Sequence, residues 1–216
     1  QNRYNGGFRE AFDLLQRGDL GPIIGSRGFV TWNRGSEYYH EADWKGTWEK
    51  EGGGVLINQA IHTLDLMTQL MGKPIEAESS FINHRLKSVI EVEDTIEAYI
   101  RFEKGEAIFY ATNACCDDSP PLIEVVCTNG RLRLEGNLLE TFSGGERSTI
   151  YAPTSGAVGE KAYWGDSHPR CIRDFYDGIQ NGSPNRVSLD SVADSFRLTL
   201  ALYQSARERR VIRFSE

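Results

Sequence analysis

The sequence lacks a long hydrophobic run and any excess of positive charge. No apolar stretch approaches the roughly 18–20 residues that a membrane-spanning helix requires. The formal net charge is −7 and no long basic run occurs, which argues against a protein that binds the phosphate backbone of nucleic acids. A small anionic ligand remains compatible, because a local group of arginines can act against a negative background. We therefore expect neither a membrane nor a nucleic acid as a partner.

Cysteine is sparse and its spacing is unfavourable for metal or disulfide sites. Cys115, Cys116, Cys127 and Cys171 form no C-x-x-C pair, and adjacent cysteines are a poor pattern for a disulfide or for zinc. No HExxH motif or Cys/His cluster is present. We therefore expect no metal site, and reduced thiols in a cytoplasmic protein.

The sequence also lacks the usual motifs for binding nucleotides. No G-x-G-x-x-G motif follows a predicted strand, and there is no Walker loop. Gly52-Gly53-Gly54 has neither the preceding hydrophobic strand nor the right spacing. We expect that this chain alone does not bind a dinucleotide in the usual way. Because the first residue is Gln1 and not Met, we expect residues 1–216 to be one domain of a longer protein.

Hydrophobic periodicity predicts an α+β fold. Spacings of three and four residues predict helices over 8–17, 52–71, 166–181 and 188–209. Alternation and β-rich composition predict strands over 23–33, 75–83, 92–102, 106–113, 122–128, 131–135, 138–142 and 211–214, with a loop over 143–165. This order favours one open, mostly antiparallel sheet with helices on one face, and another subunit against the other face. The last two helices are predicted to bury Ile172, Phe175, Tyr176 and Ile179, and Val192, Phe196, Leu200 and Tyr203.

The helix after the glycine run carries the main candidates for chemistry. Asn58, His62, Asp65 and Gln69 recur at helical spacing, so they share one face, and the glycines permit a close approach to the backbone. His62 is the candidate acid/base, because imidazole titrates near neutral pH; the alternative is a histidine hydrogen-bonded for structure. Asn58 is expected to orient a hydroxyl or His62, or else to satisfy N–H groups of the first turn. Asp65 is a possible partner of the imidazole, or a solvated carboxylate.

Substrate contacts are expected from an aromatic segment and from isolated polar residues. An aromatic segment of 17 positions holds Trp32, Arg34, Tyr38, Tyr39, His40, Trp44 and Trp48, and flat rings suit the C–H faces of sugars. The alternative for the rings is core or interface packing. Arg3 and Arg34 are candidate anion clamps, or else surface ion pairs. His168 opens a helix and is a candidate ligand contact, or a structural residue.

The central motif resembles that of a known enzyme family. Gly52-Gly53-Gly54, Asn58-Gln59, His62 and Asp65 resemble the C-terminal domain of the Gfo/Idh/MocA oxidoreductases. Supporting matches are Gln1-Asn2-Arg3-Tyr4-Asn5, Trp32-x-Arg34, Tyr38-Tyr39, Trp44-x-x-x-Trp48-Glu49-x-Glu51, and His168 with Ile172-x-Asp174-Phe175 and Ala201-x-Tyr203-x-Ser205-Ala206. The start and the aromatic segment most resemble the nucleotide-sugar branch, the UDP-N-acetylglucosaminuronate 3-dehydrogenase-like members.

The resemblance implies a two-domain enzyme. An N-terminal Rossmann domain would hold NAD or NADP and supply a lysine from a Glu-Lys-Pro motif that this sequence lacks. This chain would be the substrate-binding and oligomerisation domain, with a fold like the C-terminal domain of glyceraldehyde-3-phosphate dehydrogenase, in a homodimer or homotetramer. Asn58 stands where the family often has Asp, which shifts acid/base work onto His62 and the absent lysine.

The implied reaction is hydride exchange between nicotinamide and a carbinol carbon of a sugar or nucleotide sugar. His62 and Asn58 would be catalytic; Arg3, Arg34, Tyr39 and His168 would bind substrate; and Gln59 would contact the cofactor. The alternative from another class is a non-catalytic carbohydrate-binding or assembly module on the same fold.

Overall fold

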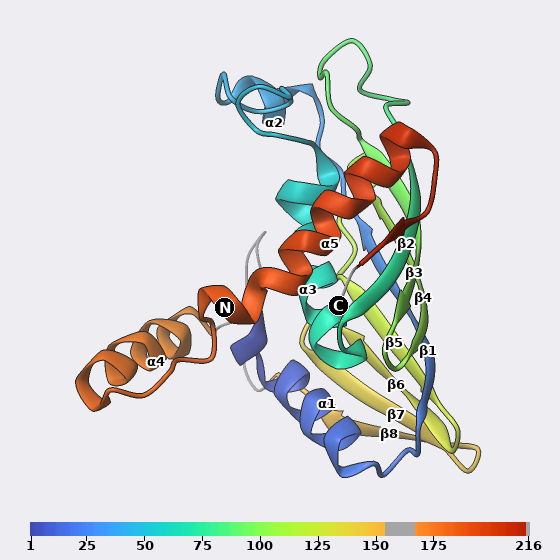
Figure 1. Ribbon diagram of the computed structural model, residues 1–216, viewed down its shortest axis with the longest axis vertical. Helices are drawn as coiled ribbons and strands as arrows, with labels where there is room; N and C mark the ends of the chain where they lie inside the picture. Colours follow the sequence, from blue (N-terminus) through green and yellow to red (C-terminus); the bar gives the residue numbers. More distant parts are fainter. Residues whose placement is uncertain (154–166, 215–216) are drawn as a thin grey trace.

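A single open sheet forms the body of the molecule. The computed structural model describes residues 1–153 and 167–214 (Figure 1). In these residues the nine strands lie in the order β8-β7-β6-β5-β1-β4-β3-β2-β9. Their bounds are β1 (Ile23–Thr31), β2 (Pro74–Ile82), β3 (Thr95–Phe102), β4 (Gly105–Thr112), β5 (Leu122–Cys127), β6 (Gly130–Glu135), β7 (Leu138–Ser143), β8 (Glu146–Tyr151) and β9 (Ile212–Arg213).

All strand pairs but one are antiparallel. β1 lies parallel to β4, with Arg27 opposite Ile108, and antiparallel to β5 on its other side. Short turns join β3 to β4, β5 to β6 and β6 to β7, as the hairpin signals predict. Alternate residues of each strand point to opposite faces, so one face carries the core and the other is left for solvent or a partner.

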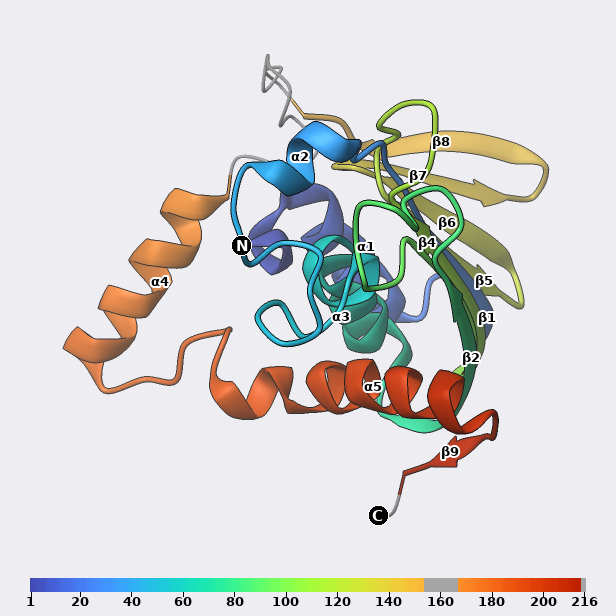
Figure 2. The ribbon, with the colours of Figure 1, turned by 90° about the horizontal axis from the view of Figure 1, so that it is seen from above.

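Three helices cover one face of the sheet. α1 (Gly6–Arg17), α3 (Ile61–Met71) and α5 (Leu189–Glu208) lie side by side against it, and no helix of the described residues covers the outer face (Figure 2). Two further helices stand away from the sheet: α2 (Ser36–His40) and α4 (His168–Asn181). The main core forms where α3 meets the strands; its fully buried side chains include Leu64, Met67, Ile96, Ile100 and Phe109. The predicted fold class is confirmed.

Several predicted element bounds need correction. β8 lies inside the stretch 143–165 that was predicted to be a loop; residues 154–166 of that stretch lie outside the described residues. Strand β8 escapes sequence detection because it is a sheet-edge strand whose residues Glu146–Ile150 are exposed. Helix α2 lies within the aromatic segment, which was not predicted to be helical. The helix predicted over 52–71 is a π-helical turn, Leu56–Ala60, followed by α3.

The predicted buried faces of the last two helices are largely wrong. On α4, Ile172, Phe175, Tyr176 and Ile179 are each more than half exposed, because this helix does not lie on the sheet. On α5, Phe196 and Leu200 are about half exposed, while Tyr203 is buried. The sequence pattern identifies an apolar face correctly, but it does not say whether the covering surface belongs to the same domain.

The helices of the described ranges are all too short or too polar to cross a lipid bilayer. All four cysteine thiols are free, with Cys127 buried and Cys116 exposed.

Candidate functional site

The glycine run allows close packing within the domain. A Cβ on Gly53 would collide with the hydroxyl of Tyr203, and a Cβ on Gly54 would collide with the main-chain carbonyl of Glu93. Gly52 has φ of +86°, which side-chain-bearing residues rarely adopt. The groups that approach this backbone are therefore the Glu93 carbonyl, just before β3, and the Tyr203 hydroxyl on α5.

Glu93 holds the start of the π-turn. Its carboxylate is buried and accepts hydrogen bonds from the N–H of Gly54 (2.9 and 3.0 Å) and of Leu56 (3.1 Å). The Tyr203 hydroxyl donates to the same carboxylate at 2.8 Å. Burial raises the pKa of Glu93, and these hydrogen bonds oppose the rise. Because helix N-termini leave unpaired N–H groups, this carboxylate fixes where the helical segment begins.

Asn58 lies in the π-turn, and His62 lies in the first turn of α3. The Asn58 amide donates to Glu51 from within the π-turn. Single π-turns occur frequently at functional sites.

His62 lies in the wall of a cavity between α3, α5 and the N-terminal segment. The cavity encloses about 620 Å³, within the range of small-molecule sites. It is lined by Gln1, Asn2, Arg3, Ile61, His62, Asp65, Val187, Leu189, Val192, Ala193, Ser195 and Phe196. Burial lowers the pKa of His62 from its usual 6.5, and the Asp65 charge opposes this shift. The imidazole is therefore mainly neutral at pH 7 and able to accept a proton.

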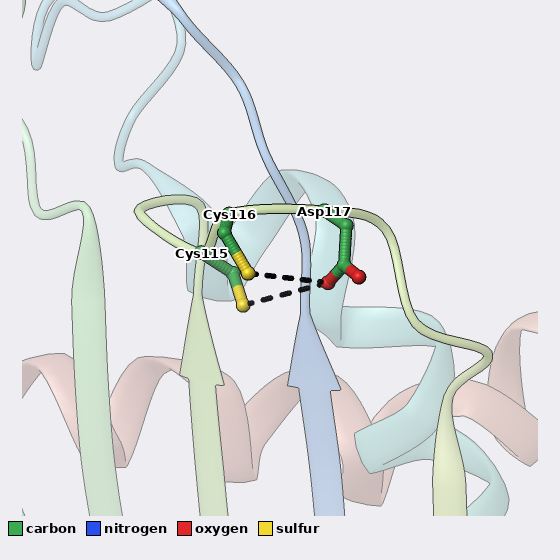
Figure 3. Close-up of side chains that lie close together, drawn as sticks. All are labelled: Cys115, Cys116 and Asp117. Carbon is green, nitrogen blue, oxygen red and sulfur yellow. Dashed lines mark hydrogen bonds between the residues drawn. The ribbon is translucent and has the colours of Figure 1, made fainter.

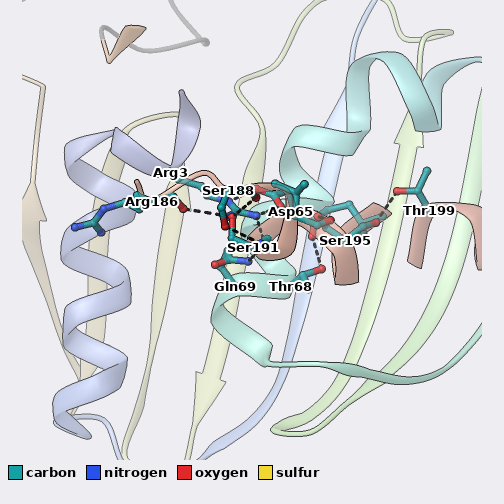
Figure 4. A network of polar contacts seen from close by, with 11 residues as sticks. Arg3, Asp65, Thr68, Gln69, Arg186, Ser188, Ser191, Ser195 and Thr199 are labelled. Atoms are coloured by element: carbon teal, nitrogen blue, oxygen red, sulfur yellow. Dashed lines mark hydrogen bonds and ion pairs between the residues drawn. The ribbon is translucent and has the colours of Figure 1, made fainter. Parts of the chain in front are cut away.

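Arg3 and Asp65 line this cavity and belong to a network of polar contacts (Figure 4). The Arg3 guanidinium donates to both carboxylate oxygens of Asp65, at 2.7 and 2.5 Å, and to the hydroxyl and carbonyl of Ser191 at 2.9 Å. Ser195 donates to Asp65 at 2.7 Å. This network joins the N-terminal segment, α3 and α5 around the cavity. Asp65 is thus paired with Arg3, and the predicted anion clamp already holds a carboxylate of its own domain.

Gln59 and Tyr39 belong to a second polar network. Gln59 donates to the Tyr38 hydroxyl at 3.1 Å and accepts from Asn113 at 2.8 Å, and Asn113 also donates to the Tyr39 hydroxyl at 2.9 Å. Burial raises the pKa of Tyr39, so its hydroxyl stays protonated. Neither Gln59 nor Tyr39 lines the His62 cavity.

Arg34 and His168 also lie outside the cavity wall. Arg34 pairs with Asp118 at 2.8 Å and lies over the Trp32 and Tyr38 rings. His168 is exposed at the start of α4. Of the predicted site residues, the structure brings His62 and Arg3 together in one cavity, with Asp65 beside them.

Sequence reasoning missed Glu93, Tyr203 and Ser195, which support this region. A weak signal was available for Glu93, because Glu93-Asp94 is an acidic pair inside the segment 92–102, which is predicted to be a strand. Both side chains are buried, which for acidic residues requires hydrogen-bond donors.

Sequence comparison supplies the family. The family described as "Oxidoreductase family, C-terminal alpha/beta domain" matches residues 13–214. The chain belongs to the Gfo/Idh/MocA oxidoreductases. The predicted family resemblance is confirmed. A search of curated proteins gives no match.

Solved structures share the fold of this Gfo/Idh/MocA domain. Levoglucosan dehydrogenase in complex with NADH and levoglucosan superposes with a TM-score of 0.85 at 16% identity, over 100% of this chain and 65% of that one. The WlbA dehydrogenase from Bordetella pertussis, in complex with NADH and UDP-GlcNAcA, gives 0.82 at 24% identity over 100% and 63%. The aldose-aldose oxidoreductase from Caulobacter crescentus, complexed with glycerol, gives 0.81 at 19% identity over 99% and 62%. The chain thus spans under two thirds of the length of these structures.

Proposed function

We propose that this domain forms the substrate-facing part of an NAD(P)-dependent oxidoreductase, which exchanges a hydride between nicotinamide and a carbinol carbon of a sugar or nucleotide sugar. The observation that carries the proposal is His62, a largely buried imidazole with a lowered pKa in the wall of a 620 Å³ cavity. A perturbed titratable group in a cavity is a recognised sign of a reactive site. The sugar complexes of the structural relatives support the substrate class.

His62 acts as the acid/base in this proposal. The neutral ring takes the proton of the substrate hydroxyl as the carbonyl forms, and returns it in the reverse direction. The Arg3–Asp65 pair positions the wall beside it and keeps the local charge balanced. Asn58, fixed through its amide nitrogen by Glu51, offers its carbonyl oxygen to a hydroxyl. Arg34, Tyr39 and His168 stay proposed substrate contacts.

A nicotinamide cofactor, when bound, supplies the hydride donor or acceptor. The relatives in complex with NADH support this cofactor class. This chain contributes little to cofactor binding in this proposal, because the sequence holds no glycine-rich dinucleotide motif. We propose that an upstream Rossmann domain holds most of the cofactor, with Gln59 at its edge.

The exposed apolar faces of α4 and α5 support the presence of such a domain. Phe175 and Ile179 on α4 and Phe196 on α5 are half exposed or more, and Phe196 also lines the cavity. Apolar faces of this kind mark interaction surfaces. We propose that the upstream domain packs on them and closes the cavity.

The test of the acid/base role uses the protein with its upstream domain. We expect His62→Asn to lower kcat by roughly 10²–10⁴-fold, the usual contribution of positioned proton transfer. In the oxidation direction, kcat/KM of the unsubstituted enzyme should fall as the pH drops through the His62 pKa, at a value below the usual 6.5. His84→Asn is the matched control, because His84 is exposed and outside the cavity.

Two outcomes separate the alternatives. If His62→Asn retains turnover with an unchanged pH profile, another group is the base. If the protein binds sugar but shows no turnover with either NAD or NADP, the domain belongs to a carbohydrate-binding or assembly module. The nucleotide-sugar branch is tested in the same assay by comparing UDP-linked sugars with free sugars.

A further inference from the structure

Two adjacent thiols and a carboxylate converge on the loop between β4 and β5. The ligand atoms of Cys115, Cys116 and Asp117 all lie within 4.8 Å of one another (Figure 3). The Asp117 Oδ1 lies 3.9 Å from the Cys115 sulfur and 3.7 Å from the Cys116 sulfur. Residues in an extended strand would point these side chains to opposite faces, but here the chain bends and both thiols face the carboxylate.

The two sulfur–oxygen distances are close to those of a tetrahedral zinc-type site. Metal–sulfur bonds of about 2.3 Å and metal–oxygen bonds of about 2.1 Å place sulfur and oxygen ligands about 3.6 Å apart. Two sulfur ligands lie about 3.8 Å apart in the same geometry. A central cation therefore requires only small side-chain movements from the observed positions.

Hydrogen bonds to the residues of β1 and of the segment after it hold this loop in place, and they leave the side chains of Cys115, Cys116 and Asp117 available. The Cys115 N–H donates to the Trp32 carbonyl at 3.0 Å, and the Asn33 amide donates to the Cys116 carbonyl at 3.2 Å. The Asp118 carboxylate accepts hydrogen bonds from the Arg34 guanidinium and from the Asn33 N–H. These bonds fix the main chain on both sides of the cluster, so little ordering is needed on binding.

We propose that Cys115, Cys116 and Asp117 bind one thiophilic divalent cation of the zinc and cadmium class. Two thiolates and one carboxylate supply three ligands, and solvent supplies the fourth. Each thiol loses one proton to solvent on binding, and no electron is transferred. A redox pair of thiols would not need the carboxylate, whereas both sulfurs contact it here. The site does not depend on the proposed dehydrogenase activity.

Cadmium titration of the reduced chain tests this site. We expect one Cd²⁺ per chain, seen as a saturable thiolate-to-cadmium charge-transfer band in the ultraviolet, and displacement of Cd²⁺ by Zn²⁺. Cys115→Ser and Cys116→Ser should each weaken binding by more than about tenfold, and Asp117→Asn by about tenfold, with the band retained. Cys171→Ser is the control, because this half-buried thiol lies on α4.

Three results would overturn the proposal. The first is no saturable band in the reduced chain. The second is binding that survives both cysteine substitutions, or that Cys171→Ser removes equally. The third is a disulfide between Cys115 and Cys116 that persists in excess reductant, detected as a mass two hydrogens lower. Circular dichroism of each variant confirms that the fold is retained.

Discussion

Glu93 and Tyr203 explain why glycines stand at positions 53 and 54, ahead of the candidate acid/base His62. Their side chains and main chain fill the space beside Gly53 and Gly54, where no Cβ fits. In return, Glu93 accepts the first N–H groups of the π-turn that carries Asn58 and leads to His62. A buried acid thus positions a polar segment that would otherwise have unpaired donors at its start.

At this scale we expect Gly54→Ala to lower the free energy of unfolding by roughly 3 kcal/mol or more, because the colliding group is main chain and cannot rotate away. Gly35→Ala is the matched control; a Cβ there meets nothing within 4 Å, so the change should stay within about 0.5 kcal/mol. Urea denaturation measures both. If Gly54→Ala leaves the free energy of unfolding unchanged, the backbone at Gly54 shifts readily and Glu93 does not fix it.

Among the elements, α4 differs most from the sequence-based prediction, because its apolar side chains are exposed and not buried. Ser167, the residue before this helix, donates its hydroxyl to the Tyr4 carbonyl at 3.0 Å, and the Tyr4 hydroxyl donates to Asp174 at 2.6 Å. These polar contacts tie one side of α4 to the N-terminal segment. Its apolar side chains, from Ile172 to Ile179, are exposed, and the helix stands away from the sheet (Figure 2).

We expect Phe175→Ser with Ile179→Ser to change the free energy of unfolding of this chain by no more than about 0.5 kcal/mol per site, because both side chains are exposed. In a longer protein that carries the proposed upstream domain, the same pair should destabilise the proposed interface. Phe109→Ala, at a fully buried site, is the positive control and should cost about 3–5 kcal/mol. A large loss in the chain alone would mean that α4 packs within this domain.

The order and type of most elements could be predicted because each carries a clear period. Strands β2 to β7 alternate, and α1 and α5 repeat at three and four residues. The start of the π-turn could not be predicted, because the carboxylate that accepts its first N–H group belongs to Glu93, about forty residues further along the chain. Nor could the exposure of α4, since an apolar stripe looks the same whether its partner lies in the same domain or in another. His62 and Arg3 were identified from sequence, whereas their shared cavity depends on how α3 and α5 pack.

At the scale of the whole molecule, the outer face of the sheet carries no helix of residues 1–153 and 167–214 (Figure 2). Ile108 and Tyr99 are exposed on neighbouring strands, and beside them Arg27 pairs with Glu124 at 2.9 Å. A face that mixes apolar side chains with paired charges suits contact with a second copy of the same surface.

We expect the chain to be a dimer or tetramer through this face, measured by light scattering. Ile108→Lys should dissociate it, because a lysine at the centre of the face would be buried without a partner. Leu189→Lys should leave the oligomer intact, since this exposed residue lies at the start of α5 on the other side of the sheet. A monomer before any substitution would contradict the sheet-face interface.

The position of β1 has a consequence for how the chain folds. Strands β2 to β4 and β5 to β8 are two meanders of neighbouring hairpins, and β1 alone joins them, although it precedes both in the chain. Each meander can form from local contacts, whereas the joining step must close a loop from β1 to β4 across more than seventy residues. Docking of β1 is therefore expected to be the slow event in folding. During synthesis, β1 leaves the ribosome first and must wait for both of its partners.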